Sequence, residues 1–341
     1  MRRAIIIVVV LALLASLSLY RSSSLQDWLL GRVSEAVMSQ HWNAEPALQA
    51  FVCGSASPLG IDSGRAQACI AIVTPEHLFI FDAGAGSVQR LMQSRLPLDR
   101  INGVFLTHYH SDHIAALGDL NLNSWVNGRP APLQVYGPVG INTVVAGFNM
   151  AYQLDRGYRT AHHGEDFLPS TAGLLQAHEI DTGIVWSDAK LVIRAIKVDH
   201  SPISPAMAYR IDYAGRSIVI SGDTVVTEDL FIAAKDVDLL FHDALSREVL
   251  SVMIDAATHV GRERVAQIMS DVIDYHADAS QLEERSDAAN IQQLVFYHMV
   301  PTPANPLLSI VFKRDLNGKT ILAEDNMVFT LPVGSREIIQ Q

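Results

Sequence analysis

The chain has 341 residues, enough to bury the core of one large domain or two small ones. Hydrophobic residues make up 49% and charged residues 18% of the sequence, an ordinary balance for a globular protein. The net charge of −11 comes without any run rich in Lys or Arg, which excludes a long nucleic acid as the expected partner.

The N-terminus differs from the rest of the chain. Met1-Arg2-Arg3 precedes the run Ala4–Leu19, which is apolar except for two serines. Residues 1–22 are therefore typical of a secretory signal peptide or an uncleaved membrane anchor, and the sequence does not decide between them. Because basic residues favour the cytoplasmic side, we expect the remainder to be exported, either to the periplasm or anchored facing the periplasm or the exterior. A buried N-terminal helix is the structural alternative.

Residues 23–47 are mostly polar and are predicted to form an irregular spacer before one domain over residues 48–335. Short apolar runs in that domain predict strands. They are Phe51–Cys53, Cys69–Val73, Leu78–Phe81, Val104–Leu106, Leu133–Tyr136, Leu191–Val198, Met207–Tyr213, Ser217–Ile220, Val237–Phe241 and Leu294–Tyr297.

Helices are predicted between these strands, whereas residues 153–190 are expected to be less regular. The helical stretches are a segment ending at Met92, Ile114–Val126, Ile141–Tyr152, Arg262–Ile273 and Gln281–Asn290. This alternation predicts an α/β fold in which two mixed sheets pack together with helices outside, a four-layer αβ/βα sandwich.

The chain has two cysteines, Cys53 and Cys69, in successive predicted strands. They can pair in an oxidising compartment or remain as two buried thiols, and the sequence leaves both open. Neither belongs to a Cys-x-x-Cys motif, so we do not expect a cysteine metal site.

The stretch His108-Tyr109-His110-Ser111-Asp112-His113 directly follows a predicted strand. Histidine nitrogens and carboxylate oxygens are the ligands that zinc and related divalent metals prefer. A strand that turns into a helix here can bring all four ligand side chains to one place. The alternative is an ordinary polar turn that happens to be rich in histidine.

Four more candidate ligands or catalytic groups each follow a predicted buried strand: His200, Asp223, His242 and His298. Strand ends that converge on one edge of a sheet are where binding sites form. A single histidine in such a place is more often structural, but four in the same context favour a metal site.

In their order along the chain, these residues resemble the metallo-β-lactamase superfamily, in its ribonuclease Z and arylsulfatase-like branch. The resemblance covers about residues 48–330. It is carried by Thr107–His113, Asp199-His200-Ser201-Pro202, Ser221-Gly222-Asp223-Thr224, Phe241-His242-Asp243-Ala244, Tyr275-His276 and Tyr297-His298, with opening segments at Gly54-Ser55 and Phe81–Gly84.

The resemblance implies the metallo-β-lactamase fold and two metal ions, which we expect to be zinc, with manganese or iron as alternatives. One ion would be bound by His108, His110, His200 and Asp223. The other would be bound by Asp112, His113, His298 and the shared Asp223. His242 and His276 resemble non-ligand active-site histidines, and we count them with Asp112 as candidate catalytic residues. Asp82 is expected to orient a ligand histidine.

We hypothesise a metal-bridging hydroxide that attacks a small phosphodiester or an aryl sulfate ester, with His276 and His242 assisting the leaving group. Ribonuclease Z enzymes carry a basic tRNA-gripping arm between the third histidine and the bridging aspartate. Here only residues 201–222 separate His200 from Asp223. We therefore expect a small-molecule ester substrate, no nucleic acid, and membrane contact only through the N-terminal segment. A homodimer stays open.

Three alternatives remain. The chain could hydrolyse a lactone or cyclic amide, act as a ribonuclease Z-like phosphodiesterase, or be a non-catalytic metal-binding module. A second ambiguity concerns His162-His163, which with Tyr158 and Arg159 could line a substrate pocket or belong to a solvated surface loop.

Overall fold

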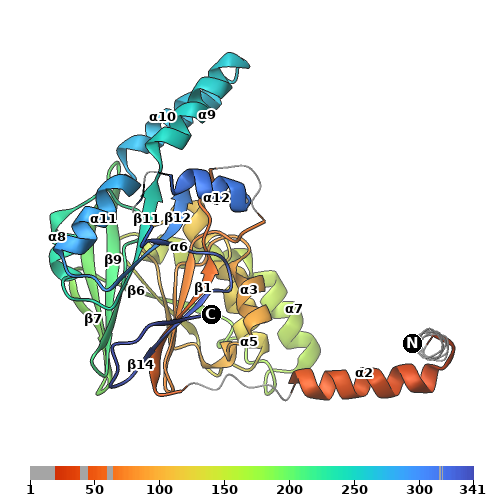
Figure 1. Ribbon diagram of the computed structural model, residues 1–341. Coiled ribbons are helices and arrows are strands. Elements are labelled where there is room, and N and C mark those ends of the chain that lie inside the picture. The colour runs from red at the N-terminus through yellow and green to blue at the C-terminus, as the bar shows by residue number, and fades with distance from the viewer. Residues whose placement is uncertain (1–19, 39–44, 60–63, 315, 317) are drawn as a thin grey trace, which may run out of the picture. The chain divides into compact units, whose positions relative to one another are not determined.

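The computed structural model describes residues 20–38, 45–59, 64–314, 316 and 318–341 (Figure 1). The chain divides into two compact units, one up to Trp42 and one from Asn43 to the C-terminus. Most of the predicted signal or anchor, residues 1–19, falls outside the described residues, so that prediction stays a prediction. Among the helices that the structure describes, none is long and apolar enough to cross a bilayer.

The first unit contains helix α2, Ser23–Met38, where we expected an irregular spacer. The expectation of irregular structure was wrong because this stretch has no proline and only one glycine, and Leu, Arg, Glu, Ala and Met are good helix formers. The Ser22 hydroxyl accepts a hydrogen bond from the Leu25 amide at 3.3 Å and so caps the first turn.

The second unit is built on two sheets that pack face to face (Figure 1). The first sheet has the strand order β15-β14-β1-β2-β3-β4-β5-β6. Its strands are β1 Ala47–Gly54, β2 Cys69–Val73, β3 Leu78–Phe81, β4 Gly103–Phe105, β5 Leu133–Gly137, β6 Leu175–Glu179, β14 Val328–Pro332 and β15 Ile339–Gln340.

The second sheet has the order β13-β12-β11-β10-β9-β8-β7. Its strands are β7 Gly183–Ser187, β8 Leu191–His200, β9 Ile203–Tyr213, β10 Arg216–Ile220, β11 Leu239–Leu245, β12 Gln293–Val300 and β13 Ile321–Leu322. Both sheets mix parallel and antiparallel pairs, as predicted: β10 runs antiparallel to β9 and parallel to β11.

The core lies between the sheets and follows the two-residue period of β-strands. On β10, Ile218 and Ile220 face the other sheet and join a cluster with Phe79 and Phe105. Val219 faces outward and packs with Leu230 of the flanking helix α8 instead. This alternation fixes the register, so residues just beyond the strand ends emerge at a defined edge.

Helices cover the outer faces and complete the four predicted layers (Figure 1). On the side of the first sheet they are α3 Ser87–Ser94, α4 Ser111–Ile114, α5 Leu117–Val126, α6 Ile141–Ala151 and α7 Gln153–His163. The others are α8 Glu228–Ala233, α9 Arg247–His259, α10 Glu263–Asp271, α11 Ala279–Ala288 and α12 Pro306–Phe312. Residues 153–190 were wrongly expected to be less regular, since they form α7, β6 and β7.

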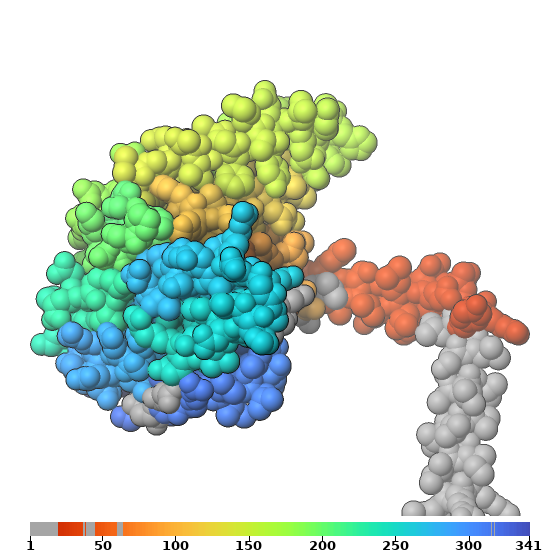
Figure 2. Space-filling view, turned by 90° about the horizontal axis from the view of Figure 1, so that it is seen from above, coloured from red at the N-terminus to blue at the C-terminus, as the bar shows by residue number. Residues whose placement is uncertain are grey.

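Helices α9 and α10 form a hairpin that rises from the edge where β11 ends (Figure 1). Seen from that side, their surface lies between the α6–α7 segment and α12 (Figure 2). The hairpin has a small core of its own, which includes Leu250, Met269 and Val272 and rests on Leu245 of β11. The hairpin therefore borders the residues that follow the strand ends at this edge.

Cys53 of β1 and Cys69 of β2 form a disulfide with a sequence separation of 16. The two strands are antiparallel neighbours, with Gly54 opposite Cys69. This pairing brings the Cα atoms of Cys53 and Cys69 to 5.0 Å from each other. The pairing that the sequence left open is thus formed.

Reduction of this disulfide should lower the free energy of unfolding by about 3 kcal/mol. Opening a loop of this length raises the conformational entropy of the unfolded chain and so stabilises the unfolded state by that amount. Urea unfolding with and without dithiothreitol measures the effect. The Cys53→Ala/Cys69→Ala double variant is the control and should have the same midpoint in both conditions. An unchanged midpoint for the natural sequence would show that the bond contributes nothing.

Candidate metal centre

Strand ends from both sheets meet at one edge, and the seven predicted metal ligands lie together there. They form two overlapping groups. Within each group, the ligand atoms all lie within 4.8 Å of one another. The first group is His108, His110, His200 and Asp223, and the second is Asp112, His113, Asp223 and His298. Asp223 belongs to both, as predicted.

The His108–His113 stretch reaches this place because β4 turns directly into α4. Strand β4 ends at Phe105, and the short helix α4 begins at Ser111. The turn between them carries His108 and His110, while the first helical turn carries Asp112 and His113, both buried. The strand–turn–helix arrangement inferred from sequence is therefore present.

In the first group, imidazole nitrogens face one another across a small space. His108 Nε2 lies 3.0 Å and His200 Nε2 lies 3.4 Å from His110 Nδ1. Asp223 Oδ2 lies 3.9 Å from the Nε2 atoms of both His108 and His200. Three nitrogens and one carboxylate oxygen thus converge, which is a donor set that suits zinc.

In the second group, Asp223 faces a different set of atoms. Asp223 Oδ2 lies 3.2 Å from His113 Nε2, and Asp223 Oδ1 lies 3.4 Å from His298 Nδ1. Asp112 Oδ2 lies 2.9 Å from His298 Nε2 and 3.5 Å from His113 Nε2. This group is richer in carboxylate than the first.

Hydrogen bonds from behind hold the ligand rings in place. His113 Nδ1 donates to Asp82 Oδ2 at 2.8 Å, and the same carboxylate accepts from the amide and hydroxyl of Thr107. His200 Nδ1 donates to the carbonyl oxygen of Tyr275 at 2.8 Å. Each bond fixes a tautomer and leaves Nε2 free to face the cluster. Asp82 has the geometry expected of a residue that orients a ligand histidine.

Backbone conformation is also adapted to the site. Gly222, directly before Asp223, has a φ of +63°, and a Cβ there would lie 2.8 Å from the carbonyl oxygen of Met207. Only glycine fits at this position. Asp82 and His298 adopt positive φ values of 58° and 47°, a conformation that non-glycine residues hold at a cost and that is concentrated at functional sites.

The residues present fit a bound metal. Three buried ligand atoms have no hydrogen-bond partner among the described residues: His113 Nε2, Asp223 Oδ1 and His298 Nδ1. Buried polar atoms without partners are rare in native proteins. Because these atoms face one another from separate elements, divalent cations would satisfy them together, and the ligand set predicts two such ions.

His276 lies beside the cluster in a third group, with Asp223 and Asp243. Its Nδ1 donates to Asp243 Oδ2 at 2.9 Å. His242 belongs to none of the three ligand groups. Its ring is fully buried and stacks on Phe231, and its Nδ1 donates to the Asp243 carbonyl oxygen at 2.8 Å and lies 3.0 Å from Asp243 Oδ1. Any contribution of His242 therefore passes through Asp243.

Sequence reasoning assigned no role to Asp243 or to the side chain of Tyr275. Asp243 is completely buried between His242 and His276. The Tyr275 ring contacts the rings of His200 and His276, with centroids 5.0 Å away in each case. The available signal was adjacency, since each residue directly neighbours a histidine that was singled out.

Burial and charge divide the histidines into two sets. Burial lowers the pKa of His108, His110 and His200 from the ordinary value of 6.5. Burial would also lower the pKa of His113 and His298, but nearby carboxylates, with Asp223 foremost, outweigh it and raise both values. Burial opposes ionisation of Asp112 as well, yet His113 and His298 hold the pKa of Asp112 at about 2.

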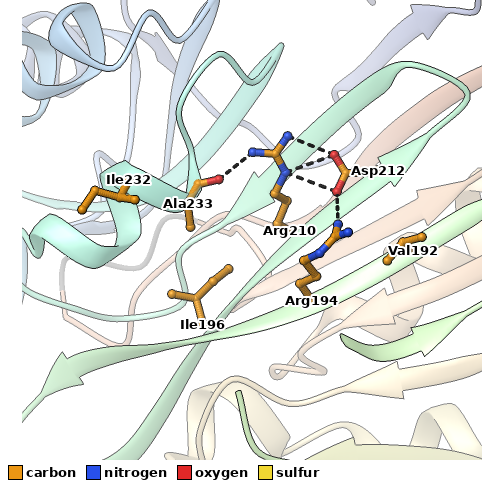
Figure 3. Close-up of a pocket in the computed structure, with 7 residues that line it drawn as sticks. All are labelled: Val192, Arg194, Ile196, Arg210, Asp212, Ile232 and Ala233. Carbon is orange, nitrogen blue, oxygen red and sulfur yellow. Dashed lines mark hydrogen bonds and ion pairs between the residues drawn. The ribbon is translucent and has the colours of Figure 1, made fainter. Parts of the chain in front are cut away.

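Other predicted or prominent features lie away from the cluster. His162 and His163 end the exposed helix α7, where Tyr158 is 68% exposed, and neither histidine is in a ligand group. An open hollow of about 510 Å³ lies on the outer face of β8 and β9 (Figure 3). There Arg194 and Arg210 both bind Asp212, so the hollow presents paired charges and no catalytic group.

Comparison with known proteins agrees with this geometry. A family model described as a beta-lactamase superfamily domain matches residues 77–299. The ribonuclease Z of Mycobacterium bovis (strain BCG / Pasteur 1173P2) is 33% identical over 257 residues, which cover 74% of this chain and 86% of that protein. The ribonuclease Z of Mycobacterium marinum is 32% identical over 257 residues, covering 74% of this chain and 87% of that protein.

Solved structures share the fold. The metallo-beta-lactamase fold protein YhfI from Bacillus subtilis superposes with a TM-score of 0.59 at 16% identity, covering 84% of this chain and 100% of that one. Human tRNase Z, short form, superposes with a TM-score of 0.59 at 20% identity, and the match covers 83% of this chain and 99% of that one. The predicted resemblance and the predicted sandwich are confirmed.

Replacement of the shared carboxylate, Asp223→Asn, should remove the bridging charge and lower the metal content from two ions per chain to one or none. Mass spectrometry of the dialysed, zinc-loaded protein measures the stoichiometry. Asp229→Asn, on the exposed side of α8, is the matched control and should keep both ions. Two ions in the Asp223 variant would refute the assignment of this residue.

The metal-free protein should be most stable near pH 6.5. His113 and His298 have raised pKa values, so their contribution is complete below 6.5 and is lost as pH rises through their folded values. His108, His110 and His200 have lowered pKa values. Below pH 6.5 they therefore bind protons in the unfolded chain more readily than in the folded one, and the stability falls as the pH decreases.

Melting temperatures of the chelator-treated protein at pH 5, 6.5 and 8.5 check this expectation. Zinc should abolish the decline on the alkaline side, because the ion replaces the protons of His113 and His298. A metal-free melting temperature that keeps rising from pH 6.5 to 8.5 would contradict the charge balance described above.

Proposed function

Because the chain belongs to the metallo-β-lactamase superfamily, we propose that it is a binuclear metal-dependent phosphodiesterase. The observation that carries the proposal is the pair of ligand groups that share Asp223, with the His276–Asp243 pair beside them. The similar ribonucleases Z support a phosphodiester over the aryl sulfate that the sequence left equally open, since a ribonuclease cleaves phosphodiester bonds.

The two ligand groups would hold zinc or a similar divalent cation. Such ions, when bound, lower the pKa of water and polarise the phosphoryl oxygen. The protein's own contribution is to fix the ligand rings through Asp82 and the Tyr275 carbonyl, and to keep the Asp223 carboxylate between the groups.

His276 is placed to deliver a proton to the leaving group. Its Nδ1 is held by Asp243, which leaves Nε2 as the atom that can carry a mobile proton. Burial alone would raise the pKa of Asp243, but hydrogen bonds from His242 and His276 outweigh burial and lower it. The ionised Asp243 carboxylate holds Nδ1, so the ring keeps Nε2 for proton transfer, as a general acid requires.

The size of the substrate follows from what borders the site. Between His200 and Asp223 the chain forms only the turn into β9, β9 itself and β10, so no arm projects there. The α9–α10 hairpin stands at the same edge, but its basic residues Arg247, Arg262 and Arg264 are matched by acidic ones. The absence of an arm there and the matched charges of the hairpin support small phosphodiesters as substrates. The similar proteins are ribonucleases, which favours RNA and weighs against our expectation of no nucleic acid.

Export is part of the proposal. The disulfide between Cys53 and Cys69 supports an oxidising compartment, because disulfides are rare where thiols are kept reduced. Alkaline phosphatase fused to the C-terminus should be active in a Gram-negative host if the chain is exported. An inactive fusion with Cys53 and Cys69 reduced would place the protein in the cytoplasm.

The substrate class is tested with the zinc-loaded protein on bis(p-nitrophenyl) phosphate, p-nitrophenyl sulfate, a lactone and a precursor tRNA. The proposal expects hydrolysis of the phosphodiester, with loss of activity in Asp223→Asn. Cleavage of only the sulfate or only the lactone would overturn the assignment. Cleavage of the tRNA would keep the chemistry and correct the expected substrate size.

His276→Ala should slow the phosphodiesterase by about 10² to 10⁴ when the leaving group is a poor one such as an alkoxide, and far less with p-nitrophenolate, which needs no proton. Asp243→Asn should show the same dependence on the leaving group. The measurement is kcat for matched methyl and p-nitrophenyl diesters. An equal loss on both esters would point to a structural role.

A further inference from the structure

The first unit of the chain presents an apolar surface that no described residue covers. Every described side chain of α2 lies at least partly in solvent, and Trp28, Leu30 and Val33 are 62%, 66% and 52% exposed. An isolated helix of 16 residues is only marginally stable in water. Helix α2 therefore needs a partner that provides an apolar environment.

Several apolar residues of α2 share one face. Leu25, Leu29 and Val33 follow one another at intervals of four residues, and Leu30 lies beside them. The opposite face carries Ser24, Asp27, Gly31 and Glu35. Trp28 and Arg32 lie on one flank between these two faces, and Gln26 interrupts the apolar one.

The position of α2 in the chain identifies the partner. It follows the apolar run Ala4–Leu19, and Tyr20, between the two, is 82% exposed. Tyrosine and tryptophan, here Tyr20 and Trp28, are the residues enriched at membrane–water interfaces. A helix of 16 residues is about 24 Å long, shorter than a bilayer core of about 30 Å, and α2 carries charged residues. It can lie on a bilayer but not cross one.

A second copy of the chain fits less well. A self-paired coiled coil needs about three to four heptads, whereas α2 spans little more than two. The side of the apolar face is also bordered by Arg32, which forms an ion pair with Glu35 at 3.0 Å. A long basic residue at the edge of an apolar face suits a lipid headgroup layer, where its charge remains in water.

We propose that α2 lies along the surface of a lipid bilayer with Leu25, Leu29 and Val33 at the boundary between headgroups and acyl chains. Helix α2 carries one basic residue, Arg32, and two acidic residues, Asp27 and Glu35, and Arg21 precedes it. The contact is therefore hydrophobic and does not require anionic lipid. The inference rests on the proposed export and on the N-terminal anchor expected from the sequence, and not on the proposed catalytic activity.

Spin labels on the full chain in phosphatidylcholine vesicles test the proposal. Because the natural cysteines are joined in the disulfide, an introduced cysteine is the only free thiol. Leu29→Cys and Val33→Cys place labels on the apolar face, and the matched variants Asp27→Cys and Ser24→Cys place them opposite. Collisions with oxygen report lipid, and collisions with a water-soluble nickel chelate report water.

The proposal expects the Leu29 and Val33 labels to collide with oxygen and to lose nickel access, with the reverse at Asp27 and Ser24. Nickel access at all four positions, in protein that floats with the vesicles, overturns the inference and leaves the anchor intact. Apolar-face labels shielded from both reagents also overturn it and indicate a protein partner. Protein that does not float overturns both the inference and the membrane location.

Discussion

The buried carboxylate of Asp223 is the constraint on which the rest of the site depends. A charge this deep in a protein is costly unless partners surround it. Asp223 is 2% exposed and lies between His108 and His200 on one side and His113 and His298 on the other. Those partners come from the turn after β4, from α4, from β8 and from β12, so both sheets must end at the same edge for the carboxylate to be matched.

Two further buried carboxylates, Asp82 and Asp243, each orient a different histidine of the site. Asp82 holds His113, which belongs to a ligand group, while Asp243 holds His276, which belongs to the proposed proton-transfer pair. The Asp82 carboxylate also accepts hydrogen bonds from Thr107, whereas the Asp243 carboxylate also pairs with His242. The metal centre and the acid group can therefore be oriented independently, although their histidines lie side by side.

Much of this arrangement could be predicted from the sequence, because strand ends are visible as short apolar runs and the ligands follow them directly. His200, Asp223 and His298 were found in this way. Asp243 was missed because one aspartate beside a histidine has no spacing to single it out. Helix α2 was missed because Trp28, Arg32 and Gln26 blur its apolar periodicity, and the disulfide stayed open because pairing depends on strand neighbours.

The central claim is that Asp223 bridges two metal ions. Crystals of the zinc-loaded protein, measured at the zinc absorption edge, test it directly through anomalous scattering. Our account predicts two anomalous peaks on either side of the Asp223 carboxylate, one among His108, His110 and His200 and one among Asp112, His113 and His298. A single peak, or a peak between Asp243 and His276, would contradict it.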